Sequence, residues 1–394
     1  MSKVVVIGGG ASGMIASIKA SLNNEVILLE GNNSLGKKIL VTGNGRCNYW
    51  NSDIDIKNYH TDDINNLENI LSNKDEVLGF LDSLGIYPKI KNGYYYPNSN
   101  MASSVDEILI KKIENSNIDV ITECKVTSIE KVNDKFIITS NLHEIICDKV
   151  IIATGSRAYP KTGSDGSSYT LLEKYHTINK VLPSLVPLIG KGNFKDWENI
   201  RIDAKATLYI NNELIDSEIG EVQLTDYGVS GIPIFNLSGL ASKNLDKNVS
   251  IKLNFLPEID NILEFLESRN NKVKANTIEE LLESVLPYKL VFMLLKKSNI
   301  NKDDNYNDIN QNKKEYFSNL ISNFNVEITD TLDFDRSQVC TGGISLTEIN
   351  PDTMESTKVK DLYLVGELLD VDGKCGGFNL GFAFISGYIA GKSV

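Results

Sequence analysis

The sequence predicts a doubly wound α/β domain into which a β-rich segment and a helical segment are inserted. Three observations predict it: a glycine-rich turn between two apolar runs near the N-terminus, a change of pattern near residue 183, and a glycine-rich segment near the C-terminus that leads into an apolar stretch. A chain of 394 residues has room for two or three domains. The predicted domains are 1–182 with 336–394, 183–257 with 326–335, and 258–325.

The N-terminal unit is predicted as strand, turn, helix and second strand. Residues 4–7 are a β-branched run of the kind that is buried on both faces of a parallel sheet. A helix is expected to follow until about Leu22, and a second buried strand, 26–29, ends at Glu30. This order is typical of the first β-α-β unit of a dinucleotide-binding fold.

Further elements of the same domain follow along the chain. Helical periodicity covers 64–84 and 102–117. Residues 120–146 alternate between apolar and polar, which predicts a meander of three short strands. A further buried strand is expected over 149–153.

From residue 183 the pattern changes to short strands separated by turn residues. Residues 206–210 and 213–216 are examples, joined by two asparagines. This pattern predicts a small antiparallel sheet or barrel over about 183–255.

Helices return after the β-rich segment. Apolar residues recur at helical spacing over 259–297, and a shorter helix is expected over 316–324. The intervening segment 299–314 is almost wholly polar, which predicts an exposed, mobile loop. A strand over 362–365 and an apolar helix over 380–390 then return to the first domain.

The composition argues against several classes of protein. Lys and Arg number 40 against 52 Asp and Glu, a net charge of −12 that repels nucleic acid and anionic membranes. Five cysteines without a tight pattern predict thiols in a reducing compartment. None of the three histidines has the spacing of a zinc site, so no metal is expected. We predict a soluble, cytoplasmic protein with no membrane segment; the oligomeric state is left open.

The first chemical motif is Gly8-x-Gly10-x-x-Gly13, which lies between the predicted strand and helix. Gly8 permits the tight turn, Gly10 lets a pyrophosphate approach the backbone, and Gly13 lets helix and strand pack closely. The acidic residue about 20 positions further on would accept hydrogen bonds from ribose hydroxyls. The predicted dinucleotide contacts are Gly8, Gly10, Ala11, Ser12, Gly13, Glu30 and Gly31.

Three further glycine-rich segments indicate that the dinucleotide is FAD, because an FAD fold returns to its cofactor at these places. They follow Glu30, end the strand at residue 153, and lie near the C-terminus. They offer backbone N–H groups, positive charge and, at Glu367, a partner for ribityl hydroxyls. The predicted FAD contacts here are Lys37, Lys38, Thr42, Gly43, Asn44, Gly45, Arg46, Cys47, Asn48, Val126, Ala153, Thr154, Gly155, Gly366, Glu367, Asp372, Gly376, Gly377, Phe378 and Asn379.

Several longer motifs make the chain resemble a known family. The segments GNGRCN, ATGS with YPKTGSDG, VPL, TGGI-x-x-x-EINPDTMES and GELLDVDG-x-CGGFN are similar to those of the BaiN-like flavoproteins, also called aminoacetone oxidase family FAD-binding enzymes. The resemblance spans nearly the whole chain. It implies a glutathione-reductase-like FAD domain interrupted by a β-barrel-like and a small helical subdomain, with flavin oxidoreduction as the activity. One member reduces a C=C bond conjugated to a ketone in a bile acid.

Two segments depart from the family pattern. An arginine common in the family is missing from Gly93-Tyr94-Tyr95-Tyr96-Pro97, and Asp226 replaces a histidine before Tyr227. Substrate identity is what these departures put in question.

The candidates for catalysis follow from the chemistry that FAD leaves to the protein, which is positioning and a proton. Tyr227 is a candidate proton donor, and Tyr94 to Tyr96 are others. Arg46 is expected to face the flavin. A redox-active pair of Cys47 and Cys375 stays an alternative, although a short C-x-x-C motif is absent.

These features predict an FAD-dependent oxidoreductase that reduces an enone-type or carbonyl small molecule by hydride transfer from flavin N5. The chain has no second strand-GxGxxG-helix unit, so NADH or NADPH would bind transiently. The alternatives are an FAD-dependent oxidase or dehydrogenase of a small amine or other donor, an RNA-modifying flavoprotein, and a non-enzymatic FAD-containing regulator.

Overall fold

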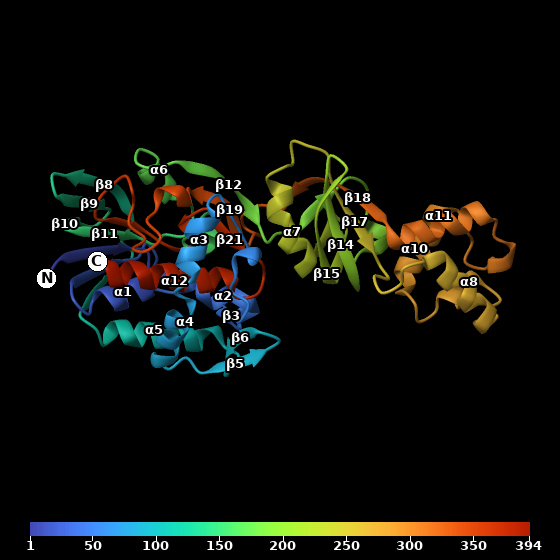
Figure 1. Ribbon diagram of the computed structural model, residues 1–394, viewed down its shortest axis with the longest axis horizontal. Coiled ribbons are helices and arrows are strands. Elements are labelled where there is room, and N and C mark those ends of the chain that lie inside the picture. Colours follow the sequence, from blue (N-terminus) through green and yellow to red (C-terminus); the bar gives the residue numbers. More distant parts are fainter. The chain divides into compact units, whose positions relative to one another are not determined.

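The computed structural model describes all 394 residues, and the chain divides into two compact units (Figure 1). The first unit combines Met1–Leu182 with Ser337–Val394, and the second is the continuous segment Pro183–Arg336. Both chain ends therefore belong to the first unit, where Asn24 donates to the carbonyl oxygen of Val394 (3.1 Å). The predicted fold class, an α/β domain together with a barrel, is confirmed.

A parallel sheet of five strands forms the centre of the first unit. Its order is β20-β11-β1-β2-β7, and every neighbouring pair is parallel. The apolar side chains of the three inner strands are buried, as the β-branched runs predict. The strands are β1 (Lys3–Ile7), β2 (Glu25–Leu29), β7 (Ile118–Ile121), β11 (Lys149–Ile152) and β20 (Leu362–Leu364).

Helices α1 (Ala11–Ala20) and α12 (Phe378–Ser393) pack against each other, although they come from opposite ends of the sequence (Figure 1). A side chain at Gly387 would overlap the carbonyl oxygen of Ser12, and one at Gly391 would overlap that of Ala16. Glycine at these two positions therefore lets the two helix backbones approach closely. This contact holds the C-terminal segment beside the N-terminal β-α-β unit.

Smaller elements complete the first unit. The predicted helix over 64–84 is two helices. The start of the predicted meander is wrong, because residues 120 and 121 belong to β7 of the parallel sheet. The meander itself is the antiparallel set β8-β9-β10. The remaining elements are α2 (Lys37–Val41), η1 (Thr42–Gly45), β3 (Trp50–Asn51), η2 (Ile56–Asn58), β4 (Tyr59–Thr61), α3 (Ile64–Leu71), α4 (Lys74–Ser83), β5 (Pro88–Lys91), β6 (Tyr94–Pro97), α5 (Ala102–Glu114), β8 (Val126–Val132), β9 (Lys135–Ser140), β10 (Glu144–Cys147), η3 (Pro160–Thr162), α6 (Ser167–Leu172), β12 (Ile178–Ser184), β19 (Val339–Ile344), η6 (Leu346–Glu348), η7 (Gly366–Leu368) and β21 (Val371–Gly373).

The second unit is built on a closed barrel with the strand order β13-β16-β15-β14-β17-β18. The short strands predicted around two asparagines are the ends of a long hairpin, because β14 and β15 run on well past them. Trp197 packs in the core of this unit, and its indole nitrogen donates to the carbonyl oxygen of Thr225 (2.8 Å). The strands are β13 (Leu188–Gly190), β14 (Ile200–Ile210), β15 (Glu213–Thr225), β16 (Gly228–Gly231), β17 (Val249–Asn254) and β18 (Phe324–Thr331).

The helices of the second unit share a core with the barrel strands. The predicted loop over 299–314 is present as far as residue 310 and most of its residues are exposed, but Ile300, Tyr306 and Ile309 are buried and anchor it, and residues 311–314 begin α11. Dividing this unit into a β-rich and a helical subdomain stays a prediction. The helical elements are η4 (Lys195–Trp197), α7 (Ile232–Ser242), α8 (Ile262–Val273), α9 (Ile278–Leu282), α10 (Tyr288–Ser298), η5 (Tyr306–Asp308) and α11 (Gln311–Ser322).

None of the helices combines the length and the apolar character that crossing a bilayer requires. No group of three or more His, Cys, Asp or Glu side chains is arranged to hold a metal ion.

Candidate dinucleotide-binding site

A cavity of about 340 Å³ lies in the first unit, at the carboxyl ends of the parallel strands β1, β2 and β11. Ligands of open α/β sheets bind at this edge. The cavity is lined from both ends of the sequence, because Gly8 to Ser12 and Glu30 meet Glu367 and Asn379 there. Its volume falls within the range of small-molecule and cofactor sites.

The turn between β1 and α1 is fixed by the protein's own backbone. A Cβ atom at Gly8 would lie 2.5 Å from the carbonyl oxygen of Ala153, and one at Gly13 would overlap the carbonyl oxygen of Gly8. At Gly10, in contrast, a Cβ atom would meet no atom within 4 Å, although Gly10 lines the cavity. The cavity therefore has open space at the glycine where a pyrophosphate needs to approach the backbone.

The N-terminus of α1 adds to this site. Gly10 is its N-cap, and no side chain caps the helix. N–H groups at a helix N-terminus attract anions, because the helix dipole places about half a positive charge there. Together with the open space at Gly10, this arrangement fits the pyrophosphate of a dinucleotide.

Glu30 is held in place at the end of β2. One carboxylate oxygen accepts from the backbone N–H of Gly9 (2.7 Å), and the other accepts from the backbone N–H and the side-chain amide of Asn32 (both 2.7 Å). Glu30 is buried but still lines the cavity. Its carboxylate is therefore oriented before any ligand arrives, as a site for ribose hydroxyls requires.

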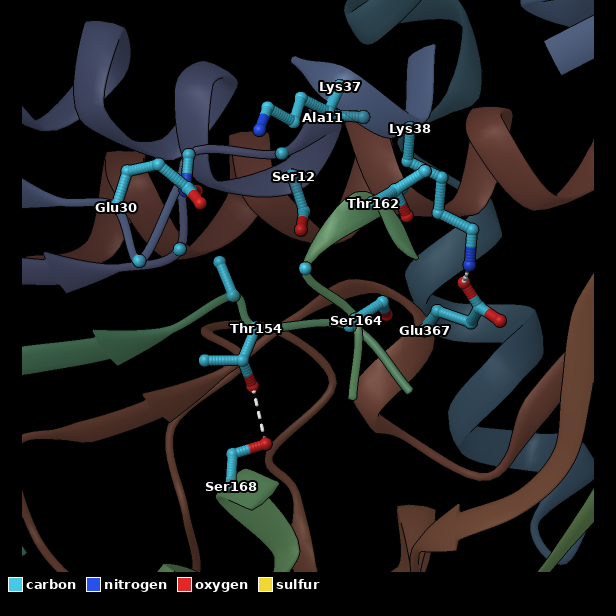
Figure 2. A pocket seen from close by; sticks show the side chains of 18 of the residues that line it. Ala11, Ser12, Glu30, Lys37, Lys38, Thr154, Thr162, Ser164, Ser168 and Glu367 are labelled. Carbon is cyan, nitrogen blue, oxygen red and sulfur yellow. Dashed lines mark hydrogen bonds and ion pairs between the residues drawn. The ribbon is translucent and has the colours of Figure 1, made fainter. Parts of the chain in front are cut away.

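At another part of the cavity, Lys38 and Glu367 form an ion pair that joins α2 to the C-terminal segment (2.5 Å; Figure 2). Glu367 also accepts from the Ser156 hydroxyl (2.6 Å) and from the backbone N–H of Cys340 (3.1 Å). Lys38 donates in addition to the carbonyl oxygen of Ala158 (3.2 Å). A cation and an anion from segments more than 300 residues apart are thus placed together in the cavity wall.

The predicted cofactor residues fall into two groups. The cavity is lined by Gly8, Gly10, Ala11, Ser12, Glu30, Gly31, Lys37, Lys38, Thr42, Val126, Ala153, Thr154, Gly155, Glu367 and Asn379. It is not lined by Gly13, Gly43, Asn44, Gly45, Arg46, Cys47, Asn48, Gly366, Asp372, Gly376, Gly377 or Phe378. For both groups, contact with FAD stays a prediction.

Residues of the second group occupy two kinds of place. Gly43 to Arg46 form an exposed loop tip. The others support neighbouring segments: for example, Gly376 accepts from the side-chain amide of Asn51 (2.8 Å), and Asp372 lies 3.3 Å from the His60 ring nitrogen. Gly376 and Gly377 therefore contact residues 50 and 51, which follow the GNGRCN motif.

Cys47 does not have the character of a reactive thiol. Its side chain is fully buried, and burial raises the pKa of the thiol to about 12. Since the thiolate is the reactive form, this environment argues against the alternative of a redox-active Cys47–Cys375 pair.

The sequence prediction missed part of the cavity wall. Asn32, Lys125 and the segment 162–168 line it as well. Segment 163–166 has no nucleotide-binding fingerprint, so no spacing indicates that it lines the cavity. The signal that could identify it is the small, polar, glycine-rich composition of YPKTGSDG.

Tyr227 lies in the second unit, at the turn between β15 and β16, where its carbonyl oxygen accepts from Gly190 (2.9 Å). Tyr94 to Tyr96 belong to β6 of the first unit. None of these tyrosines lines the cavity, and their role as proton donors stays a prediction.

A family model described as HI0933-like protein Rossmann domain matches residues 2–393. The chain belongs to this family. It is 36% identical, over all of its length and 99% of the relative, to a 3-dehydro-bile acid delta(4,6)-reductase of Clostridium scindens. It is also 25% identical, over 99% of its length and 97% of the relative, to a ribosomal RNA dihydrouridine synthase of Escherichia coli. The predicted BaiN-like resemblance is confirmed.

Two solved structures share the fold. A flavocytochrome c3 fumarate reductase matches with a TM-score of 0.52 at 14% identity, covering 100% of this chain and 78% of its own. A 3-ketosteroid-delta4-(5alpha)-dehydrogenase of Rhodococcus jostii matches with a TM-score of 0.51 at 13% identity, covering 100% of this chain and 96% of its own. These likenesses concern the fold alone. Family membership and the reductase relative support the coarse prediction of an FAD-dependent oxidoreductase.

Proposed function

We propose that this protein is an FAD-dependent reductase that uses NADH or NADPH to reduce a C=C bond conjugated to a carbonyl group in a small molecule. The observation that carries the proposal is the 36% identity to a 3-dehydro-bile acid delta(4,6)-reductase along both chains. In the substrate so named, a double bond at C4 is conjugated to a ketone at C3. The dihydrouridine synthase relative supports the same reaction class, because the double bond reduced in uracil is also conjugated to a carbonyl group.

The reaction balances without a further oxidant or reductant. NAD(P)H gives up a hydride, the substrate gains that hydride at its β carbon and a proton at its α carbon, and NAD(P)⁺ leaves. When bound, FAD supplies the chemistry that relays the hydride. The protein must hold the cofactor, orient the substrate and deliver the proton.

The residues that line the cavity account for the first task, which is to hold the cofactor. Glu30, oriented by Gly9 and Asn32, would hold the ribose of the adenosine part. The open space at Gly10 and the N-terminus of α1 would hold the pyrophosphate. Glu367 and Lys38 would hold the ribityl chain, because carboxylates accept and ammonium groups donate hydrogen bonds to hydroxyls.

For the proton we propose Tyr227 or one of the tyrosines of β6, with Arg46 at the flavin. A tyrosine hydroxyl can protonate a carbon or stabilise an enolate by a hydrogen bond. Replacing each tyrosine by phenylalanine separates the candidates: the variant of the true donor should lose turnover at unchanged reduction of the flavin by NAD(P)H.

A second candidate is reduction of uracil in RNA, which the two dihydrouridine synthase relatives favour. The net charge of −12 argues against it, and acidic side chains outnumber basic ones in both units. A small-molecule enone, which has no polyanionic backbone, is therefore our first choice of substrate.

The test is anaerobic rapid mixing of the FAD-loaded protein with NADH or NADPH, followed by a panel of substrates. We expect loss of the oxidised flavin absorbance with one nicotinamide, and its return on adding a conjugated enone but not the matching saturated ketone. Return only with uridine-containing RNA would favour the second candidate. Absence of reduction by either nicotinamide would contradict the proposal, and peroxide formation from an amine in air would then favour an oxidase.

A further inference from the structure

One wall of the cavity is a single loop, residues 155–166, which we call the strap. It begins after β11 and ends where α6 starts. Gly155 and all residues from Thr162 to Gly166 line the cavity. Figure 2 shows Thr162 and Ser164 of this loop near Ala11 and Ser12 of α1. The strap and the N-terminal β-α-β unit therefore both contribute to the cavity wall.

The strap is a closed loop with its own internal bonds. Its base is joined by a hydrogen bond from the Thr154 hydroxyl to the Ser168 hydroxyl (2.7 Å; Figure 2). Within the loop, the Ser164 hydroxyl donates to the carbonyl oxygen of Ser156 (3.1 Å). Surface loops of this length whose ends lie close together form compact Ω-loops, which are frequently functional. The strap is therefore one compact piece attached at its base, and a movement about that base would carry it as a whole.

The backbone at the two ends of the strap suits such a movement. Gly155 (φ 71°) and Gly166 (φ 76°) both have left-handed conformations, which residues with a side chain rarely adopt. Glycine at these ends permits large changes of backbone angle.

Four polar contacts fasten the strap to other segments. One is the hydrogen bond from the Ser156 hydroxyl to Glu367 (2.6 Å), and the donors of the other three lie outside the strap. The Asn32 side-chain amide donates to the carbonyl oxygen of Thr162 (3.0 Å), and Lys38 donates to that of Ala158 (3.2 Å). Lys125 forms an ion pair with Asp165 (2.8 Å). The three donors come from three different segments, and each also lines the cavity. The contacts thus lie at the edge of the cavity, where the strap meets the neighbouring segments.

The Lys125–Asp165 pair is the contact most open to water. The two side chains are 57% and 42% exposed. Although partial burial opposes it, hydrogen bonds from Lys125 and Ser167 lower the pKa of Asp165, so the pair is charged at neutral pH. An exposed ion pair is weakened by salt. This fastening can therefore be loosened without disturbing the buried contacts of Glu30.

We propose that the strap is a clasp over the bound cofactor and that its polar fastenings set the rate at which FAD leaves. The inference rests on the proposed FAD site. A cofactor in the cavity lies between the strap and α1, because both line it. Its release then requires the fastenings to open. The Lys125–Asp165 pair has no hydrogen bond to Glu30 or Glu367, so opening that pair leaves these two carboxylates in place. Loosening the strap should therefore raise the dissociation rate.

The experiment compares FAD-loaded wild-type protein with Asp165→Asn, Lys125→Met and the double variant. FAD release is followed by the recovery of its fluorescence after dilution, at low and high salt. We expect each single variant to release FAD about two to five times faster, the range for an exposed ion pair. The double variant should be no faster than the singles, and high salt should accelerate only the wild type. The matched control is Lys191→Met, which breaks a similarly exposed pair with Glu327 in the second unit and should release FAD at the wild-type rate.

Limited trypsin digestion supplies a readout independent of FAD fluorescence. Arg157 and Lys161 lie in the strap and are exposed, so bound FAD should slow cleavage after them and Asp165→Asn should restore it. Cleavage after the exposed Lys274 of the second unit should not change. Equal FAD release and equal strap cleavage in all variants would overturn the clasp while leaving FAD binding intact. A folded protein that binds no FAD would overturn both proposals.

Discussion

Two glycine-rich segments adjoin the same cavity, yet they differ in what holds them. The turn at residues 8–13 is fixed by contacts of the protein with itself, because side chains at Gly8 or Gly13 would strike backbone atoms. The loop at residues 42–46 is an exposed tip, in which Gly43 and Asn44 have left-handed φ values of 55° and 54°. Of that loop, only Thr42 lines the cavity.

This difference shows that glycine occurs in the two segments for different structural reasons. In the first segment glycine is required by the fold, so its pattern can be interpreted from sequence and local structure alone. In the second, the left-handed backbone of Gly43 and Gly45 (φ 55° and 78°) favours glycine, and a Cβ atom at Gly43 would lie 3.1 Å from the backbone nitrogen of Asn48, a milder contact than at Gly8 or Gly13. Substitutions of Gly8 or Gly13 should therefore damage stability, whereas substitutions at Gly10, where a side chain meets no protein atom, or at the exposed tip of the second segment should cost little stability.

The largest effect is expected from Gly13→Ala. The added methyl group would overlap the carbonyl oxygen of Gly8, where neither backbone can yield without shifting β1 from α1. Overpacking of this kind costs about 3 kcal/mol of unfolding free energy or more. Urea unfolding of the purified variant, or its failure to accumulate as folded protein, measures the effect. A wild-type unfolding midpoint would show that the turn is not fixed as described.

Gly10→Ala provides the contrast within the same turn. Its Cβ atom would meet no protein atom within 4 Å, and the backbone φ of −81° suits alanine. We expect wild-type stability, but FAD affinity weakened about 100-fold, because the methyl group would occupy the pyrophosphate space. Calorimetric titration with FAD tests this. A variant that is unstable yet binds FAD normally would reverse our account of the two glycines.

A third effect, on the pH dependence of stability, is expected at Asp106 in helix α5, which packs against α2 and η1. Asp106 of α5 is buried against Gly36, one of its carboxylate oxygens has no hydrogen-bond partner, and burial raises its pKa from 3.8 to about 6. The folded state thus holds this proton more tightly than the unfolded state. Its contribution is present at low pH and is lost as pH rises from about 4 to about 6, a loss of about 2–3 kcal/mol.

Asp106→Asn removes that loss because the amide does not ionise. Relative to wild type, the variant should gain stability between about pH 4 and pH 6 and keep a constant advantage above that range. Urea unfolding at a series of pH values measures the difference. An advantage that does not vary with pH would show that the carboxyl group titrates normally.

The smallest change in stability is expected from Arg46→Ala in the exposed loop. A surface substitution of this kind changes the unfolding free energy by less than about 0.5 kcal/mol. If Arg46 contacts the flavin, the FAD affinity should fall about fivefold, the value of one exposed charged contact. Arg201→Ala, an exposed arginine of the barrel, is the control and should leave FAD affinity unchanged. Equal FAD affinity in both variants would remove Arg46 from the site.

The difference between features fixed by local packing and features that depend on distant contacts also explains what could be predicted from the sequence. The strands β1 and β2, helix α1 and Glu30 follow from apolar periodicity and a glycine spacing that local packing requires. The helix pairing of α1 with α12 could be expected only from the family order of motifs, because Gly387 and Gly391 carry no local signal.

The errors have physical causes as well. The sequence predicts that residues 120 and 121 start the meander, but they belong to β7, whose partner β2 lies about 90 residues earlier and makes them part of the parallel sheet. Segment 299–314 is almost wholly polar, yet three buried apolar side chains anchor it. The strap has no periodicity, and its place in the cavity wall depends on side-chain contacts with Asn32, Lys38 and Lys125.

The most direct test of the central claim is the visible absorption spectrum of the purified, folded protein, with titration by FAD if the cofactor is lost in purification. We predict oxidised flavin bands and one FAD bound per chain, with binding weakened by Gly10→Ala at unchanged stability. A folded protein that stays colourless and takes up no added FAD would contradict the account.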